Sequence, residues 1–158
     1  MDHVFFMNRA YQEAIKAFDE GEVPVGAVIE KDGIIIGKGY NRVENLFDAT
    51  AHAEIIAISA ASSKLSDWRL SGCNLYVTTE PCLMCLGALV LSRIDTIIYG
   101  AAEPRTGAIH SHFYRQQIES SFGYFPKVIN GIMEFECGSL LSSFFKQIRQ
   151  NGSTDTHK

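Results

Sequence analysis

Apolar residues recur with a helical period near the start of the chain. Over residues 4–18 they return every three or four positions, which predicts an amphipathic helix with one buried face. Asp2 stands where an N-cap belongs, and Gly21 stands where this helix is expected to end. The pattern therefore predicts a first helix with both ends marked.

A β-hairpin is predicted next. Residues 25–29 and 34–39 form two β-rich runs that are separated by Lys31-Asp32-Gly33. An Asp-Gly pair between two such runs is a strong signal for a tight turn. The two runs are therefore expected to pair as antiparallel neighbours.

The rest of the chain alternates strands with helices. The pattern predicts helices over 49–62, 81–91 and 135–150, and strands over 75–79, 96–99 and 127–133. Pro81 suits a first helical turn, because its missing N–H would have no partner there, and Gly100 is expected to open a loop. This order implies an α/β sandwich, with the hairpin at one edge of the sheet and crossover connections after it.

Length and composition fit one globular domain. The chain has 158 residues, 46% of them hydrophobic, with 13 glycines and only 4 prolines. We treat residues 1–150 as one domain and expect a polar, disordered tail over 151–158. No apolar run approaches the roughly 18 to 20 residues that span a bilayer, and the first residues lack the pattern of a signal peptide. These features predict a soluble, cytoplasmic protein with no membrane partner.

The net charge is −4, from fourteen Lys and Arg against eighteen Asp and Glu, and by itself it suggests no polyanionic partner. The charge is uneven along the chain. Residues 1–92 hold seven basic and twelve acidic groups, or −5, whereas residues 93–158 hold seven basic and six acidic groups, or +1. A nucleic-acid surface would therefore be local and would draw on the second part of the chain.

Two short segments carry the candidate chemistry, His52-Ala53-Glu54 and Pro81-Cys82-Leu83-Met84-Cys85. Cys82 and Cys85, at i and i+3 of a helix, place both sulfurs on one face, and a helix start lowers the pKa of a thiol toward the thiolate that binds zinc. A nitrogen of His52 makes a set of three ligands, which leaves a fourth tetrahedral position for water, as in catalytic zinc sites. Glu54 is then placed to take a proton from that water. Thiolate and imidazole ligands favour zinc, and iron stays open as an alternative metal.

Each segment alone has other interpretations. A Cys-x-x-Cys pair also occurs in redox sites and as half of a structural zinc site, and a lone His-x-Glu is common by chance. A structural site needs two more ligands, and the sequence has no second Cys-x-x-Cys. Cys73 and Cys137 have no partner in sequence, and we interpret them as small buried apolar groups.

Together the two segments match the H-x-E…P-C-x-x-C signature of zinc nucleobase deaminases. Across residues 4–150 the chain further resembles the bacterial tRNA-specific adenosine deaminases, the TadA family. Where this family often has Asp and Lys, the chain has Glu103 and Arg105, and residues 109–126 match the family poorly. The stretches that carry the resemblance are Glu22-Val23-Pro24-Val25-Gly26-Ala27-Val28, Gly39-Tyr40-Asn41-Arg42, Thr50-Ala51-His52-Ala53-Glu54, Glu80-Pro81-Cys82-Leu83-Met84-Cys85, Ser92-Arg93-Ile94, Thr106-Gly107-Ala108 and Glu136-Cys137.

The resemblance implies a three-layer α/β/α sandwich of the cytidine deaminase type, with a central mixed sheet of about five strands. It also implies a homodimer that deaminates adenosine to inosine hydrolytically at the wobble position of a tRNA anticodon, that of an arginine tRNA. It assigns one Zn2+ per chain to His52, Cys82 and Cys85, and proton transfer to Glu54. Asn41 corresponds to an asparagine that contacts the flipped-out nucleoside, since its amide can donate and accept; without the family it is as readily a turn residue.

Candidate RNA contacts lie in one loop and in the last helix. The loop contains Glu103, Arg105 and Thr106 and continues into a mixture of cations and aromatics that is common in single-stranded RNA binding, namely His110, His112, Phe113, Tyr114 and Arg115. A solvated loop around a buried Phe explains that mixture about as well. Phe145 is a further candidate substrate-binding residue, although core or dimer packing explains Phe144 and Phe145 more readily. Lys146 and Arg149 either contact phosphate or face solvent near a helix C-terminus.

Two other functions stay open. An enzyme with the same fold and zinc would act on a free base or nucleoside, such as guanine or cytosine, and the acidic net charge supports that alternative. A zinc-stabilised binding module without turnover would have no use for Glu54. A structural zinc site gains nothing from an open fourth position, which argues against the binding module.

Overall fold

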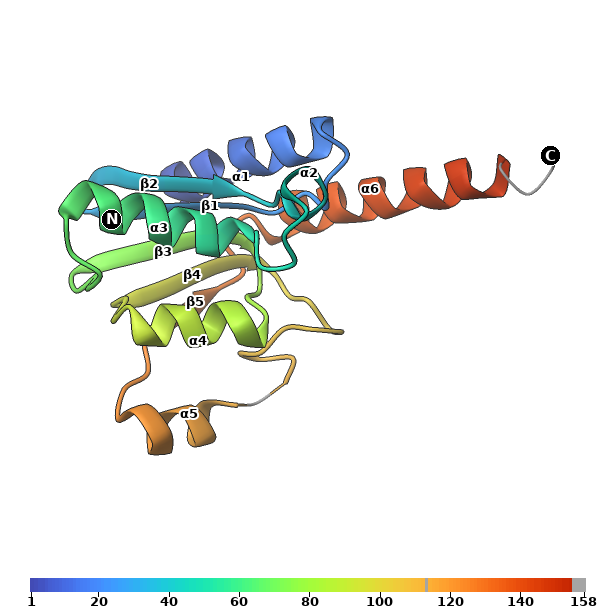
Figure 1. Ribbon diagram of the computed structural model, residues 1–158. Helices are drawn as coiled ribbons and strands as arrows, with labels where there is room; N and C mark the ends of the chain where they lie inside the picture. Colours follow the sequence, from blue (N-terminus) through green and yellow to red (C-terminus); the bar gives the residue numbers. More distant parts are fainter. Residues whose placement is uncertain (113, 155–158) are drawn as a thin grey trace.

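The computed structural model describes residues 1–112 and 114–154. Five strands form one sheet in the order β2-β1-β3-β4-β5 (Figure 1). β1 pairs antiparallel with β2 and with β3, whereas β3, β4 and β5 run parallel, so the expected mixed sheet with a hairpin at one edge is confirmed. In chain order the elements are α1 (His3–Asp19), β1 (Gly26–Lys31), β2 (Ile34–Tyr40), α2 (Val43–Leu46), α3 (Ala53–Leu65), β3 (Cys73–Thr79), α4 (Leu83–Leu91), β4 (Thr96–Ala101), α5 (Arg115–Phe122), β5 (Lys127–Asn130) and α6 (Glu134–Thr154).

Helices cover both faces of the sheet, which gives the expected three layers (Figure 1). α1 and the first part of α6 pack on one face, where Met7, Tyr76 and Cys137 are buried together. α3, α4 and α5 cover the other face over a larger core that includes Cys73 and Leu86. Both unpaired cysteines are thus buried, as interpreted from the sequence. Within the described residues, no helix combines the length and apolar character that a membrane crossing needs.

Local signals in the sequence account for α1 and the hairpin. The carboxylate of Asp2 caps α1 by accepting the backbone N–H of Phe5 at 2.9 Å. The hairpin loop is Asp32-Gly33, and both residues have left-handed backbone, with φ of 52° and 81°. A two-residue hairpin loop with positive φ at both positions follows the twist of its strands, which is why Asp-Gly suits this turn.

Close packing between β2 and α3 fixes where α3 begins. A Cβ at Gly39 would lie 2.3 Å from the carbonyl oxygen of Ala53, and a Cβ at Gly37 would lie 2.6 Å from that of Ala57. Only glycine permits this approach of helix to strand. The first turn of α3 therefore lies directly over the end of β2, and His52 lies at that end of the sheet.

The starts of two helices differ from the prediction. α3 begins at residue 53 rather than 49, because a turn precedes it in which Asp48 accepts the backbone N–H of Thr50 at 2.8 Å. α4 begins at Leu83, so Pro81 precedes the helix and does not occupy its first turn. The carbonyl of Pro81 instead accepts the N–H of Ala108 at 2.9 Å, which ties it to a later loop.

Other boundaries also differ. Gly100 lies within β4 and opens no loop. A glycine is needed there because Cys137 of α6 packs on the strand, and a Cβ at position 100 would lie 2.8 Å from its Sγ. β5 ends at Asn130, short of the predicted 133, and α2 and α5 were not predicted. Residues 151–154, expected in a tail, continue α6, which extends away from the body in Figure 1. Residues 155–158 lie outside the described part of the chain.

Candidate metal centre and active site

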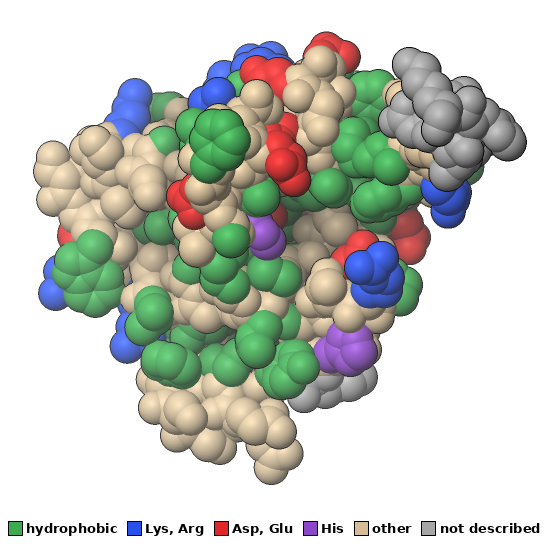
Figure 2. All heavy atoms as spheres, turned by 45° about the vertical axis from the view of Figure 1, so that its right-hand side comes forward, with side chains coloured by type: hydrophobic (Ala, Val, Ile, Leu, Met, Phe, Trp, Pro, Cys, Tyr) green, Lys and Arg blue, Asp and Glu red, His purple; other side chains and the backbone are tan. Residues whose placement is uncertain are grey.

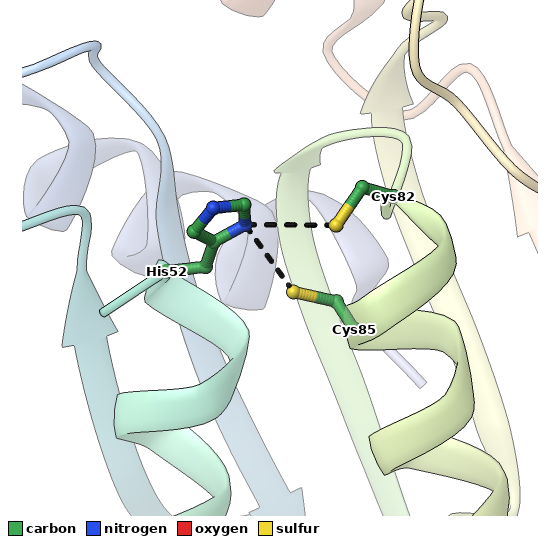
Figure 3. A group of neighbouring side chains, drawn as sticks. All are labelled: His52, Cys82 and Cys85. Carbon is green, nitrogen blue, oxygen red and sulfur yellow. Dashed lines mark hydrogen bonds between the residues drawn. The ribbon is translucent and has the colours of Figure 1, made fainter. Parts of the chain in front are cut away.

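Three ligand-type side chains meet where α3 and α4 begin. His52 is the N-cap residue of α3 and Cys82 is that of α4, each with extended backbone at ψ of 154° and 173°. Neither side chain caps its own helix in the described structure. Both face the space between the two helix starts, where Cys85 joins them from the first turn of α4 (Figure 3).

The spacing of the three donor atoms fits one metal ion. Nδ1 of His52 lies 3.6 Å from Sγ of Cys82 and 3.5 Å from Sγ of Cys85. A tetrahedral zinc with Zn–N and Zn–S bonds of about 2.1 and 2.3 Å holds such atoms about 3.6 Å apart. Among the described residues, this is the one group of three or more His, Cys, Asp or Glu side chains with donor atoms within 4.8 Å of one another. The set therefore fits a zinc site with a fourth position left for water.

The pKa values of the two thiols are shifted in opposite directions. Hydrogen bonds with Cys85 and, to a smaller extent, His52 together lower the pKa of Cys82 to about 4, although burial opposes them. The hydrogen bond between the two thiols, together with burial and the Glu54 carboxylate, raises the pKa of Cys85 well above its usual range. The sequence predicted that the helix start lowers the pKa of these thiols, whereas hydrogen bonds with Cys85 and His52 are what lower the pKa of Cys82 here. A metal that binds here must displace the Cys85 proton.

Glu54 is a buried acid beside this centre. It lies in the first turn of α3 and is only 3% exposed. Burial raises the pKa of its carboxyl to about 7, against the opposing effects of a hydrogen bond with Cys85 and the nearby His52. A carboxyl with such a pKa takes up and releases a proton readily near neutral pH, which suits general acid–base chemistry.

A cavity of about 400 Å³ opens next to these residues and is lined by His52, Glu54 and Cys82. Its walls come from separate parts of the chain: the segments before β1 and after β2, the end of β3, the loop after β4, and α6. Figure 2 shows acidic and apolar side chains around a hollow on this side of the molecule, with basic side chains nearer its margins. A volume of this order accommodates a small organic ligand such as a base or nucleoside.

Four of the five predicted substrate-binding residues line this cavity: Asn41, Glu103, Thr106 and Phe145. The amide nitrogen of Asn41 donates to the carbonyl of Val23 at 3.2 Å. Its Oδ1 is buried and has no hydrogen-bond partner among the described residues. An unpaired amide oxygen in a cavity wall is suited to accept a hydrogen bond from a ligand.

The other candidate contacts lie outside the cavity lining. Arg105 is exposed, and its backbone N–H donates to the side chain of Glu103 at 3.0 Å within the same loop. Lys146 and Arg149 are exposed on α6. Phe113, named above with the cations and aromatics of this loop, lies outside the described residues.

Glu80 holds the loop after β4, a role that the sequence did not single out. Its buried carboxylate accepts the backbone N–H groups of Glu103, Ile109, His110 and Ser111 at 2.9–3.2 Å, and the hydroxyl of Ser111 at 2.6 Å. These hydrogen bonds hold the pKa of Glu80 below its usual range although burial opposes them. This one carboxylate thereby fixes both ends of the loop whose Glu103 and Thr106 line the cavity. In the sequence, a Glu that precedes Pro-Cys did not indicate such a role.

Comparisons with known proteins agree with this site. A model of the MafB19-like deaminase family matches residues 1–149. The tRNA-specific adenosine deaminase of Aquifex aeolicus is 46% identical over 151 residues, which cover 96% of this chain and 99% of that protein. The chain belongs to the family of the tRNA-specific adenosine deaminases.

Two solved structures place the chain within the family. A structure from work on A-to-I editing by tRNA:A34 deaminases at the wobble position of transfer RNA has a TM-score of 0.81 and 41% identity, covering 86% of this chain and 98% of that one. The guanine deaminase of Bacillus subtilis has a TM-score of 0.62 and 43% identity, but it covers only 65% of this chain and 66% of its own. The resemblance to the editing deaminases thus extends over more of the fold.

Proposed function

We propose that the protein deaminates adenosine to inosine at the wobble position of a tRNA anticodon, with an arginine tRNA as substrate. The observation that supports this most directly is the meeting of His52, Cys82 and Cys85 with a buried Glu54 at one end of the cavity. Adenosine and water give inosine and ammonia, so the reaction needs a water activated for attack and a group that moves protons. This donor set and this acid meet those two needs.

His52, Cys82 and Cys85 hold one zinc ion per chain in this proposal. When bound, zinc supplies Lewis-acid activation of a water molecule. As the water oxygen bonds to C6, the Glu54 carboxylate accepts one proton from the water and delivers it to N1 of the base. Glu54 then transfers the second water proton from the new hydroxyl to the exocyclic amine, and ammonia leaves as the C6–N6 bond breaks and the C6=O bond of inosine forms. Burial keeps the pKa of Glu54 near neutral, so that both transfers are accessible to it.

The cavity receives the target base in this proposal. Oδ1 of Asn41 accepts a hydrogen bond from it, and Phe145, which is 40% exposed at the opening, packs against it or its neighbour. Glu103 and Thr106 bound the opposite side on the loop that Glu80 fixes. The nucleoside is thereby oriented toward Glu54.

RNA binding by a chain of net charge −4 has to rely on local cations. Arg105 on the loop and Lys146 and Arg149 on α6 are exposed and are our candidates for phosphate contacts. Affinity that depends on phosphate contacts falls steeply with added salt. We therefore expect binding of a stem-loop to weaken strongly between low and high salt.

We further infer a cytoplasmic homodimer. Three apolar side chains of α4 are exposed: Leu83 and Met84 at its start, beside the metal ligands, are 50% and 37% exposed, and Leu91 at its end is 57% exposed. Apolar surface gathered on one helix favours burial against a partner, and a second copy of the chain is the partner we propose. Sedimentation at several concentrations tests it, and a Leu83→Lys variant should shift the protein toward monomer.

A free-base deaminase is the second candidate function. The 43% identity to a guanine deaminase over 65% of the chain favours it, as does the acidic lining of the cavity. A small uncharged base would need none of the exposed cations.

One experiment separates the two. The zinc-loaded protein is given an arginine anticodon stem-loop with A at the wobble position, the same stem-loop with G there, another stem-loop with wobble A, and free adenosine, guanine and cytosine. Ammonia and the deaminated product are followed. Inosine formed in the arginine stem-loop and no free-base turnover would support the proposal. Turnover of a free base alone would overturn it, and equal rates on both A-containing stem-loops would overturn the arginine assignment.

A further inference from the structure

Two neighbouring threonines of β3 occupy opposite faces of the sheet. The hydroxyl of Thr78 lies on the α1 face and accepts the backbone N–H of Gly26 at 3.1 Å. Thr79 lies on the other face and lines the cavity. Both side chains are buried, with exposed fractions of 1% and 6%. The pair therefore offers two threonines in nearly the same backbone setting, of which only one faces the proposed substrate.

The hydroxyl of Thr79 is unpaired. Its Oγ1 is shielded from solvent and has no hydrogen-bond partner among the described residues. Buried hydroxyls are nearly always hydrogen-bonded, and an exception calls for a specific reason. Packing alone does not supply that reason, because a valine of almost the same shape would fill the position without a polar atom.

The position of Thr79 points to a ligand as the missing partner. Thr79 is the last residue of β3, three residues before Cys82, and it pairs with Ala101 of β4. Asn41, whose Oδ1 is likewise unpaired, lines the same cavity from the end of β2. Two unpaired polar groups, the hydroxyl of Thr79 and Oδ1 of Asn41, thus belong to the wall of one cavity. Rotation about the Cα–Cβ bond of a threonine exchanges hydroxyl and methyl between staggered positions, so that the hydroxyl can turn toward a bound base.

We propose that Thr79 is a specificity-determining residue whose hydroxyl hydrogen-bonds a polar atom of the base bound in the cavity. This inference rests on the proposed function, because it takes the base of the substrate as the ligand. The edges of a purine carry ring-nitrogen acceptors and an amine donor, and a hydroxyl serves either. The hydrogen bond is formed on binding, so it adds affinity for the base and relieves an unpaired group of the free protein.

The test compares Thr79→Val with Thr78→Val. Thr79→Val removes only the hydroxyl, so KM for the arginine stem-loop should rise and kcat/KM fall about tenfold, with zinc content and Tm no lower than in the unmodified protein. Thr79→Ser keeps a hydroxyl and should retain kcat/KM to within about threefold. Thr78→Val should show the reverse. It leaves the N–H of Gly26 unpaired, so Tm should fall, whereas kcat/KM measured at temperatures well below the Tm of this variant should be nearly unchanged.

The outcomes separate this inference from the proposed function. If Thr79→Val and the unmodified protein have equal KM and kcat/KM, or if Thr79→Ser is as impaired as Thr79→Val, the hydroxyl has no role in binding and the inference is overturned. If the unmodified protein deaminates a free base and not the stem-loop, the proposed function fails. The same three variants then test Thr79 on that base. A rise in KM confined to Thr79→Val would support the hydroxyl contact with either substrate.

Discussion

Gly107 packs against the carboxylate of Glu80, and a Cβ at position 107 would lie 2.4 Å from Cδ of Glu80 and 2.6 Å from the carbonyl oxygen of Glu103. Gly107 also forms a bridge with Cys82. The loop that bounds the cavity, the buried acid that fixes it and the start of the metal-binding helix therefore meet at one position that has no room for a side chain.

Gly107→Ala should displace this loop and leave the metal ligands bound to zinc. We expect kcat/KM for the stem-loop to fall about 100-fold, because a displacement of about 1 Å is enough to disturb substrate orientation. Steady-state kinetics and zinc content check this. Gly138→Ala in α6, where a Cβ would meet only ordinary contact with Ala101 at 3.8 Å, is the matched control and should leave kcat/KM unchanged. Equal kinetics for both variants would contradict the role given to the loop.

Removal of the metal should loosen the starts of α3 and α4. The N-cap side chains His52 and Cys82 do not cap their helices, and in the proposed site both bind zinc, which would hold the two helix starts together. Chelation should lower Tm, and readdition of zinc should restore it. Retention of zinc against a competing chelator should weaken as pH falls, because Cys85 must lose its proton to bind and its pKa is raised. A Tm that is insensitive to chelation, once zinc loss is verified, would contradict this.

Glu54→Gln should abolish most turnover while zinc stays bound. Loss of a general acid–base group typically costs about 100- to 10,000-fold in rate. The amide fills the same space in the first turn of α3, so one zinc per chain and a similar Tm are expected. Single-turnover measurement of inosine, with metal analysis of the same sample, gives both quantities. Substantial activity in this variant would contradict the acid–base role given to Glu54.

Much of this site could be predicted from the sequence because its ligands depend on local geometry. His52, Cys82 and Cys85 could be singled out from two short motifs, although both helices begin later than predicted, and the Asp-Gly hairpin follows from turn chemistry. Contacts between distant segments could not be predicted. Gly100 continues a strand because Cys137 packs on it.

Glu80 and Pro81 show the same limit. Pro81 lies outside the helix because Ala108, 27 positions later, hydrogen-bonds it, and Glu80 gains its role only when the loop after β4 folds back onto it. The hydrophobic periodicity of a sequence does not indicate hydrogen bonds between distant segments. Helix α2 has only four residues, which is too short for a helical period to be detected.

Alkaline pH should destabilise the protein through Tyr76. Burial in the core raises the pKa of its hydroxyl from 10 to about 12, so the unfolded chain loses this proton first as pH rises. Its contribution to stability is complete below pH 10 and is lost as pH rises through about 12. Tyr76→Phe should therefore flatten the fall in unfolding free energy over this range. At neutral pH it should cost about 1 kcal/mol for the lost hydrogen bond to His3. Urea unfolding at several pH values measures both effects, and parallel curves for the two proteins would contradict this.

Phe144 and Phe145 should separate stability from substrate binding. Phe144 is 6% exposed and contacts the ring of Phe18, so Phe144→Ala should destabilise the protein by about 3 kcal/mol. Phe145→Ala should cost under about 1 kcal/mol, since its ring is 40% exposed, yet raise KM for the stem-loop. Denaturant unfolding and kinetics on both variants decide this, and an unchanged KM for Phe145→Ala would remove it from the substrate-binding residues.

Helix α6 follows all five strands in the chain, yet it supplies one wall of the cavity through Leu141, Phe144, Phe145 and Ile148. During synthesis, the metal ligands and Glu54 leave the ribosome long before this wall does. A nascent chain can therefore pair its strands and present its two thiols to cellular zinc while the cavity is still open along one side. Acquisition of the metal and enclosure of the substrate cavity are separated in time by the order in which the protein is made.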